Sequence, residues 1–124
     1  FHDSSPILLS FFATWCIPCK QELPQLDSLS NIYTNIQFFY IASGNERESI
    51  KSKEISDYKN NLKLSQKILI DKYGRVFKKY TNNNSFPLTV LINNSEVFYF
   101  SEIYDKKASI DILTNKFDKI LKDE

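Results

Sequence analysis

The chain has 124 residues, which is long enough to bury a hydrophobic core without disulfide staples, so we predict a single domain over residues 1–124. Its formal net charge is +1, with acidic and basic residues interspersed, which argues against a nucleic-acid or membrane-surface function based on bulk charge. No apolar run approaches the ~20 residues that a membrane span requires. The chain contains no methionine, so we expect a processed or trimmed product from which any export signal or anchor has been removed.

The first part of the chain predicts a β-α-β unit. Residues 1–6 are expected to form an N-terminal tail. The short apolar run 6–13 predicts a buried strand, and the run 36–42 predicts a second one. Between them, leucines at every third position predict a helix from Cys16 to about Ser30.

The second part of the chain predicts further helices and a hairpin. The charged stretch 45–61 is typical of an exposed helix, with Asn45 as its N-cap. Two β-rich runs separated by a turn-forming Asn-Asn-Ser sequence predict an antiparallel hairpin. Together these patterns predict an α/β fold with a mixed central sheet and helices on both faces. The remaining predicted elements are a short strand at 67–71, a turn at 72–74, a brief helical segment at 75–80 and an amphipathic helix through Ile110, Leu113, Phe117 and Ile120.

The chain has two cysteines, Cys16 and Cys19, in a Cys-x-x-Cys arrangement. This spacing alone fits a dithiol–disulfide centre, half of a zinc site or a soft-metal carrier loop. A structural zinc site needs four ligands, yet the single histidine, His2, lies in the expected tail. A structural disulfide across two residues would remove little chain entropy. A strand before the pair and a helix after it favour redox chemistry, because a helix N-terminus stabilises a thiolate.

The stretch FFATWCIPCKQELP (11–24) resembles the active site of the thioredoxin superfamily. In particular, it is similar to the extracytoplasmic TlpA, ResA and CcmG-type thiol–disulfide oxidoreductases. Trp15 precedes the first cysteine, and Pro18 fills the second intervening position. Glu22 and Pro24 match the Glu-x-Pro of this branch. The resemblance implies a thioredoxin-like fold.

The resemblance continues to about Leu121 and includes the family's cis-proline loop. Ser10 stands where cytosolic thioredoxins carry a buried aspartate, which favours the extracytoplasmic branch. Pro87 matches the cis-proline, and Phe86 stands where the family commonly has threonine or valine. A cis bond there would leave the Phe86 backbone facing the cysteines, ready to pair with a substrate strand. By this resemblance Trp15, Pro18, Phe86 and Pro87 form the substrate-binding surface.

The resemblance also implies the catalytic roles. Cys16 attacks a client disulfide as a thiolate, and Cys19 then attacks Cys16 and releases the reduced client. Glu22 lies three residues beyond Cys19 on the same helix face, and partial desolvation would raise its pKa toward neutrality. It would then be suited to accept the Cys19 proton. We expect no metal and no cofactor besides the Cys16–Cys19 redox centre.

The expected function is the reduction of client protein disulfides in the bacterial cell envelope, for example in cytochrome c maturation. The expected partners are disulfide-containing clients and an upstream membrane thiol reductase, with no nucleic acid. The resemblance implies a monomer in the periplasm or another extracytoplasmic location, soluble or anchored through a removed N-terminal segment. Two alternatives stay open, a copper- or zinc-carrying Cys-x-x-Cys module and a redox-inert thioredoxin-like interaction domain.

Overall fold

The computed structural model describes residues 5–44 and 50–122. Its centre is a five-stranded sheet with the strand order β3-β2-β1-β4-β5. The first three strands are parallel, β4 runs antiparallel to β1, and β5 runs antiparallel to β4. In chain order the elements are β1 (Ile7–Phe12), α1 (Ile17–Ile32), β2 (Gln37–Ser43), α2 (Ser52–Leu62), β3 (Ile68–Asp71), the 3-10 helix η1 (Phe77–Lys79), β4 (Leu88–Asn93), β5 (Glu96–Ser101) and α3 (Ser109–Lys122).

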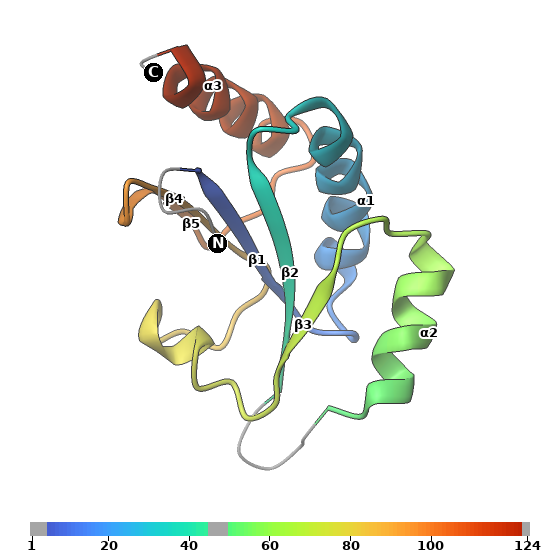
Figure 1. Cartoon of the computed structure of the whole chain (residues 1–124). Helices are drawn as coiled ribbons and strands as arrows, with labels where there is room; N and C mark the ends of the chain where they lie inside the picture. Colours follow the sequence, from blue (N-terminus) through green and yellow to red (C-terminus); the bar gives the residue numbers. More distant parts are fainter. Residues whose placement is uncertain (1–4, 45–49, 123–124) are drawn as a thin grey trace.

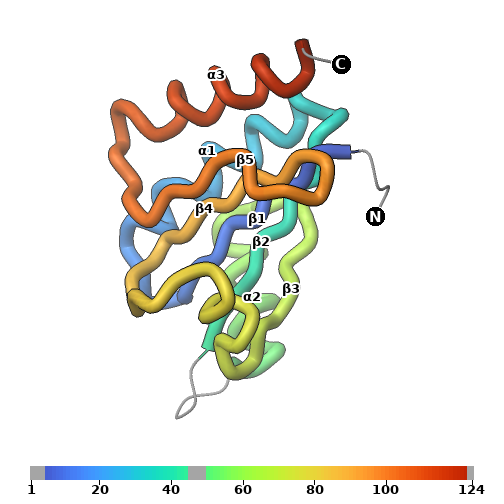
Figure 2. The backbone as a smooth tube through the Cα atoms, turned by 90° about the vertical axis from the view of Figure 1, so that its left-hand side faces the viewer, coloured from blue at the N-terminus to red at the C-terminus, as the bar shows by residue number. Residues whose placement is uncertain are grey.

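The three α-helices all cover the same face of this sheet (Figure 1). Successive strand residues point to opposite faces, so Leu8 and Phe12 of β1 join the core beneath the helices. Phe11, between them, faces the other side. In the described part of the chain, η1 is the helical element that covers this second face, and Figure 2 shows η1 in front of the sheet and α1 behind it. The predicted α/β fold with a mixed sheet is confirmed, and its helices are divided unevenly between the two faces.

The position of η1 on the second face of the sheet is fixed by a carboxylate at the end of β3. Asp71 accepts the backbone N–H groups of Val76 at 3.2 Å and Phe77 at 2.9 Å, which orders the start of η1. The chain reaches this point through Gly74, whose φ of 71° lies in the left-handed region that glycine adopts without steric cost. Phe77 then packs edge-on against Phe11, with the ring centroids 5.8 Å apart.

Two predicted boundaries differ from the structure. Helix α2 begins at Ser52 rather than at 45, because Lys51 is extended, with φ −95° and ψ 139°, and acts as the N-cap. Asn45, the predicted N-cap, lies outside the described residues. The predicted tail also ends earlier, since Pro6 is buried and its carbonyl accepts the N–H of Gln37 at 3.0 Å. The predicted hairpin is confirmed, with positive φ at the turn residues Asn94 and Ser95.

A buried carboxylate ties α1 to the rest of the fold. Asp27, on the inner face of α1, accepts the hydroxyl of Tyr40 in β2 at 2.8 Å. It also accepts the backbone N–H groups of Ser65 at 2.9 Å and Gln66 at 3.2 Å, just before β3. A buried charge is tolerated when several donors satisfy it. Asp27 therefore fixes the position of α1 against two parallel strands.

We expect Tyr40→Phe to destabilise the protein by about 1–2 kcal/mol, because it removes a hydrogen bond to a buried carboxylate. Tyr58→Phe is the matched control. Among the described residues the buried Tyr58 hydroxyl has no hydrogen-bond partner, so its loss should leave the free energy of unfolding unchanged or slightly higher. Urea denaturation of the two variants and the unchanged protein measures both effects. Equal losses in the two variants would contradict the stabilising role of Asp27.

Candidate active site

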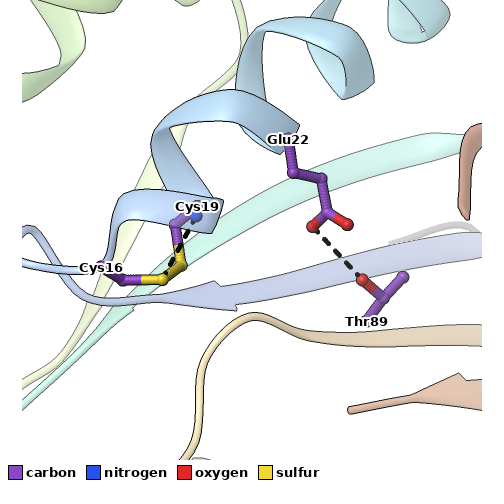
Figure 3. The surroundings of a disulfide bond; sticks show 4 residues. All are labelled: Cys16, Cys19, Glu22 and Thr89. Carbon is purple, nitrogen blue, oxygen red and sulfur yellow. Dashed lines mark hydrogen bonds between the residues drawn. A yellow bond between two sulfur atoms is a disulfide. The ribbon is translucent and has the colours of Figure 1, made fainter. Parts of the chain in front are cut away.

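The two cysteines lie where β1 ends and α1 begins, and a disulfide joins them (Figure 3). Cys16 is the N-cap of α1, and its sulfur accepts the backbone N–H of Cys19 at 3.2 Å. This contact satisfies one of the N–H groups that a helix start leaves unpaired, and a thiolate at the same position would be stabilised more strongly. Pro18 fits the first turn because it has no N–H to satisfy there.

The disulfide itself is covered, and its neighbours are not. Cys16 is 3% exposed and Cys19 is fully buried. Trp15 and Ile17, on either side of Cys16, are each 68% exposed. A client that reaches Cys16 would therefore meet two large apolar side chains before it meets sulfur. Pro18 is exposed beside them.

Three aromatic side chains, one from the residue before Cys16 and two from the chain before β4, lie in contact with one another. We call Trp15, Phe86 and Phe77 the aromatic wall. The Trp15 ring meets Phe86 edge-on, with centroids 5.8 Å apart, and Phe86 packs against Phe77 at 4.6 Å. The Phe86–Pro87 peptide bond is cis, as predicted, and Pro87 is buried. The structure thus brings Trp15 and Phe86 together, although 71 positions separate them in the sequence.

Glu22 lies one helical turn beyond Cys19 and points toward the sheet (Figure 3). It is 4% exposed, and burial raises the pKa of its carboxyl to about 7. The hydroxyl of Thr89 in β4 donates a hydrogen bond to Glu22 Oε1, which opposes this rise in pKa. At 3.5 Å the bond is long for two oxygens, so it stabilises the charged form only weakly. A carboxyl with this pKa gains and loses a proton readily near neutral pH.

The residues that surround Glu22, Thr89 and Tyr104, were not predicted from the sequence. Thr89 lies two residues after Pro87, and it pairs in register with Ser10 on β1. Strand alternation from Leu91, which faces the helices, could have placed Thr89 opposite α1. Beyond Glu22 on α1, Gln25 accepts the hydroxyl of Tyr104 and so connects α1 to the loop after β5. No periodic pattern marks this last contact, because Tyr104 lies in a loop.

Residues 5–44 and 50–122 contain no group of three or more His, Cys, Asp and Glu side chains placed to hold a metal ion. In the same ranges, no helix is both long and apolar enough to cross a membrane.

The raised pKa of Glu22 makes stability depend on pH. In the unfolded chain this carboxyl loses its proton near pH 4.5, and in the folded protein near pH 7. Between these values the folded state holds more protons, so the free energy of unfolding falls as pH rises through this window. We expect Glu22→Gln, which is neutral at every pH, to remove about 3 kcal/mol of this decrease. Urea denaturation at pH 5 and pH 8 measures the change in the free energy of unfolding between these two pH values. An equal change in the Glu22→Gln variant and the unchanged protein would contradict the burial of the charged carboxylate.

With this geometry established, comparison with known proteins identifies the family. The thioredoxin family matches residues 1–81. The thioredoxin-like protein YneN of Bacillus subtilis is 32% identical over 91 residues, which are 73% of this chain and 52% of YneN. The thiol-disulfide oxidoreductase ResA of Geobacillus kaustophilus is 30% identical over 94 residues, which are 73% of this chain and 51% of ResA. The chain spans about half the length of these relatives.

Solved structures agree with the fold. A secreted Mycobacterium tuberculosis disulfide oxidoreductase, homologous to E. coli DsbE, superposes with a TM-score of 0.74 at 21% identity. The match covers 93% of this chain and 81% of that one. The predicted resemblance to the thioredoxin superfamily is therefore confirmed by the sequence comparisons, and the solved structure has the same fold. The chain belongs to the thioredoxin family.

Proposed function

We propose that this protein is a thiol–disulfide oxidoreductase that reduces disulfides of client proteins. The observation that carries the proposal is the Cys16–Cys19 disulfide at the N-terminus of α1, with a buried carboxyl of pKa about 7 one turn further along. A redox-inert domain would not need a buried carboxyl group that titrates near neutral pH one helical turn from the disulfide. The dithiol is itself the redox group, so we propose no further cofactor and no metal.

The chemistry needs two exchange steps. In the first, the Cys16 thiolate attacks a client disulfide, so that a Cys16–client bond forms, the client disulfide breaks and one client thiolate leaves. In the second, Cys19 loses its proton and attacks the Cys16 sulfur, which restores the Cys16–Cys19 bond and releases the second client thiolate. Two electrons pass to the client, and the dithiol becomes the disulfide seen in Figure 3.

Each residue of the site supports one of these steps. The N-terminal end of α1 favours the thiolate at Cys16, which is the attacking form. Cys19 is fully buried, where a thiol gives up its proton reluctantly, so a nearby base is needed. Glu22 is about half ionised near pH 7 and takes this proton. Trp15, Pro18 and Phe86 form the surface on which the client lies, next to the buried Pro87.

The relatives support a proposed location and proposed partners. The M. tuberculosis structural neighbour is described as secreted, and ResA is named as a thiol-disulfide oxidoreductase. On this basis we place the protein in the bacterial cell envelope, as a monomer that an upstream membrane thiol reductase reduces again after each turnover. Apocytochrome c is one client that this location allows.

Trapping tests the proposed function. We expect Cys19→Ser to accumulate mixed disulfides with client proteins through Cys16, because the resolving thiol is missing. Non-reducing gel electrophoresis, followed by release with dithiothreitol, detects these complexes. Cys16→Ser is the matched control and should trap nothing. A metal-carrying module or a redox-inert domain would show no difference between the two variants.

An equilibrium redox titration tests the reducing direction. We expect the Cys16–Cys19 couple to titrate against dithiothreitol with a potential closer to the about −270 mV of thioredoxin than to the about −120 mV of DsbA. The proline between the cysteines and the family match favour this direction. A value near that of DsbA would make the protein an oxidant and overturn the reducing function, while leaving the exchange chemistry intact.

A further inference from the structure

A small cavity adjoins Glu22 at the edge of the helix-covered layer. Its volume is about 10 Å³, and its walls come from α1, β4, β5, the loop after β5 and the start of α3. Neither cysteine and no member of the aromatic wall lines it. Ile103, in the outer part of the lining, is 76% exposed, so the cavity lies close to the protein surface. Glu22 thus has the disulfide along its helix and this cavity beside its carboxyl.

The cavity is polar enough and large enough for one water molecule. A buried water needs roughly 10–15 Å³ and two to four polar partners. Glu22, Thr89, Ser101 and Ser109 all line the space. The Ser109 Oγ accepts the N–H of Asp105 at 2.7 Å, and in the described part of the chain its own hydroxyl donates no hydrogen bond. That hydroxyl is therefore available to a water between it and the carboxyl.

Three contacts hold the outer wall of this cavity in place. The Ser101 hydroxyl donates to the carbonyl of Ile103 at 2.8 Å, which fixes the turn at the end of β5. The Tyr104 hydroxyl donates to Gln25 on α1. The Asp105 carboxylate accepts the N–H of Lys107 at 2.8 Å at the approach to α3. These hydrogen bonds therefore hold the end of β5, the loop after it and the approach to α3 in place beside the cavity.

Glu22 is the group on this cavity that titrates near neutral pH. From β4 it faces Thr89, and from β5 the phenol of Tyr99 lines the same space. From the loop it faces Tyr104, whose pKa is raised by burial first and then by the charges of Glu22 and Asp105. The lining contributed by α3 is Ser109, Ile110 and Leu113, which carry no charge. A pH dependence measured at this site near neutrality therefore belongs to Glu22.

We propose that this cavity holds a water molecule that hydrates the Glu22 carboxylate and passes its proton to solvent on the β5–α3 side. The inference rests on the proposed function, in which Glu22 takes the proton of Cys19. It adds the path by which the proton of Glu22 reaches solvent. The client covers the surface made by Trp15 and Phe86, whereas the proton leaves through the space between β5 and α3. Proton exchange with solvent then continues while the client is covalently attached.

Filling the cavity tests the proposal. Ile110→Phe adds a ring to a half-buried side chain that lines the space. We expect the larger side chain to exclude the water, so that the charged form of Glu22 is less hydrated and its pKa rises further. Carbon-13 NMR titration of the Glu22 carboxyl in the oxidised protein measures this rise. Because no thiol takes part, the measurement does not depend on catalysis.

The same variant should slow the resolution step. Stopped-flow mixing of the reduced protein with excess dithiobis(nitrobenzoic acid) separates the attack by Cys16 from the concentration-independent attack by Cys19. We expect the pH midpoint of the second phase to follow the pKa of Glu22 upward in Ile110→Phe. For a rise of one pKa unit from about 7, the rate at pH 7 falls roughly fivefold and recovers at higher pH.

Two further variants make the outcome decisive. Ser101→Val replaces a hydroxyl of the lining by two methyl groups, and we expect a change in the same direction without an added ring. Ile112→Phe adds the same ring to the exposed side of the same helix, away from the cavity, and should match the unchanged protein. A wild-type pKa and pH midpoint in both Ile110→Phe and Ser101→Val would overturn the cavity route.

Glu22→Gln separates this proposal from the proposed function. If its resolution rate keeps the wild-type pH profile, Glu22 is not the base, and the proposed role of Glu22 fails whatever the cavity does. If the Gln variant loses the pH dependence but the cavity variants do not shift it, Glu22 is the base and its proton leaves by another path. Only a shift in both sets supports the route between β5 and α3.

Discussion

The seating of α1 against the sheet is the constraint on which the site depends. One turn after another, this helix presents Cys16 as its cap, then Cys19, Glu22 and Asp27, and all but Cys16 face inward from the helix itself. Asp27 sets the depth of the helix, because its carboxylate accepts donors from β2 and from the segment before β3. Had the helix moved outward, Glu22 would be solvated and its pKa would return toward its ordinary value. The disulfide and the carboxyl group that positions the helix thus belong to the same element, α1.

The same helix gives two acidic side chains opposite environments. Asp27 accepts three hydrogen bonds, which satisfy the oxygens of its buried carboxyl group. Glu22 has one long hydrogen bond from Thr89, so burial dominates and its pKa rises to about 7. The two carboxyls are five positions apart and both are buried. They differ in the number of hydrogen bonds that each accepts from the described residues, which is three at Asp27 and one at Glu22.

Much of this molecule could be predicted from local pattern. The buried strands, the hairpin, the helix after Cys16 and the cis bond before Pro87 all follow from periodicity, turn chemistry or the family resemblance. The spacing to Cys19 placed Glu22 on the same helix face, and the structure shows that this position is buried. Thr89 and Tyr104 were missed because they reach α1 from strands and loops more than 60 residues away. The start of α2 was misplaced because a charged run carries no apolar period that marks where a helix begins.

Asp71, at the end of β3, influences side chains beside the disulfide through a series of contacts. Asp71 orders the N–H groups at the start of η1, and this places Phe77. Phe77 supports Phe86 from behind, and Phe86 meets Trp15 beside the disulfide. Selection on the client preference proposed above could therefore act at Asp71, without any change in Cys16 or Cys19. A substitution of this carboxylate would change the shape of the proposed client surface and leave the proposed exchange chemistry unaltered.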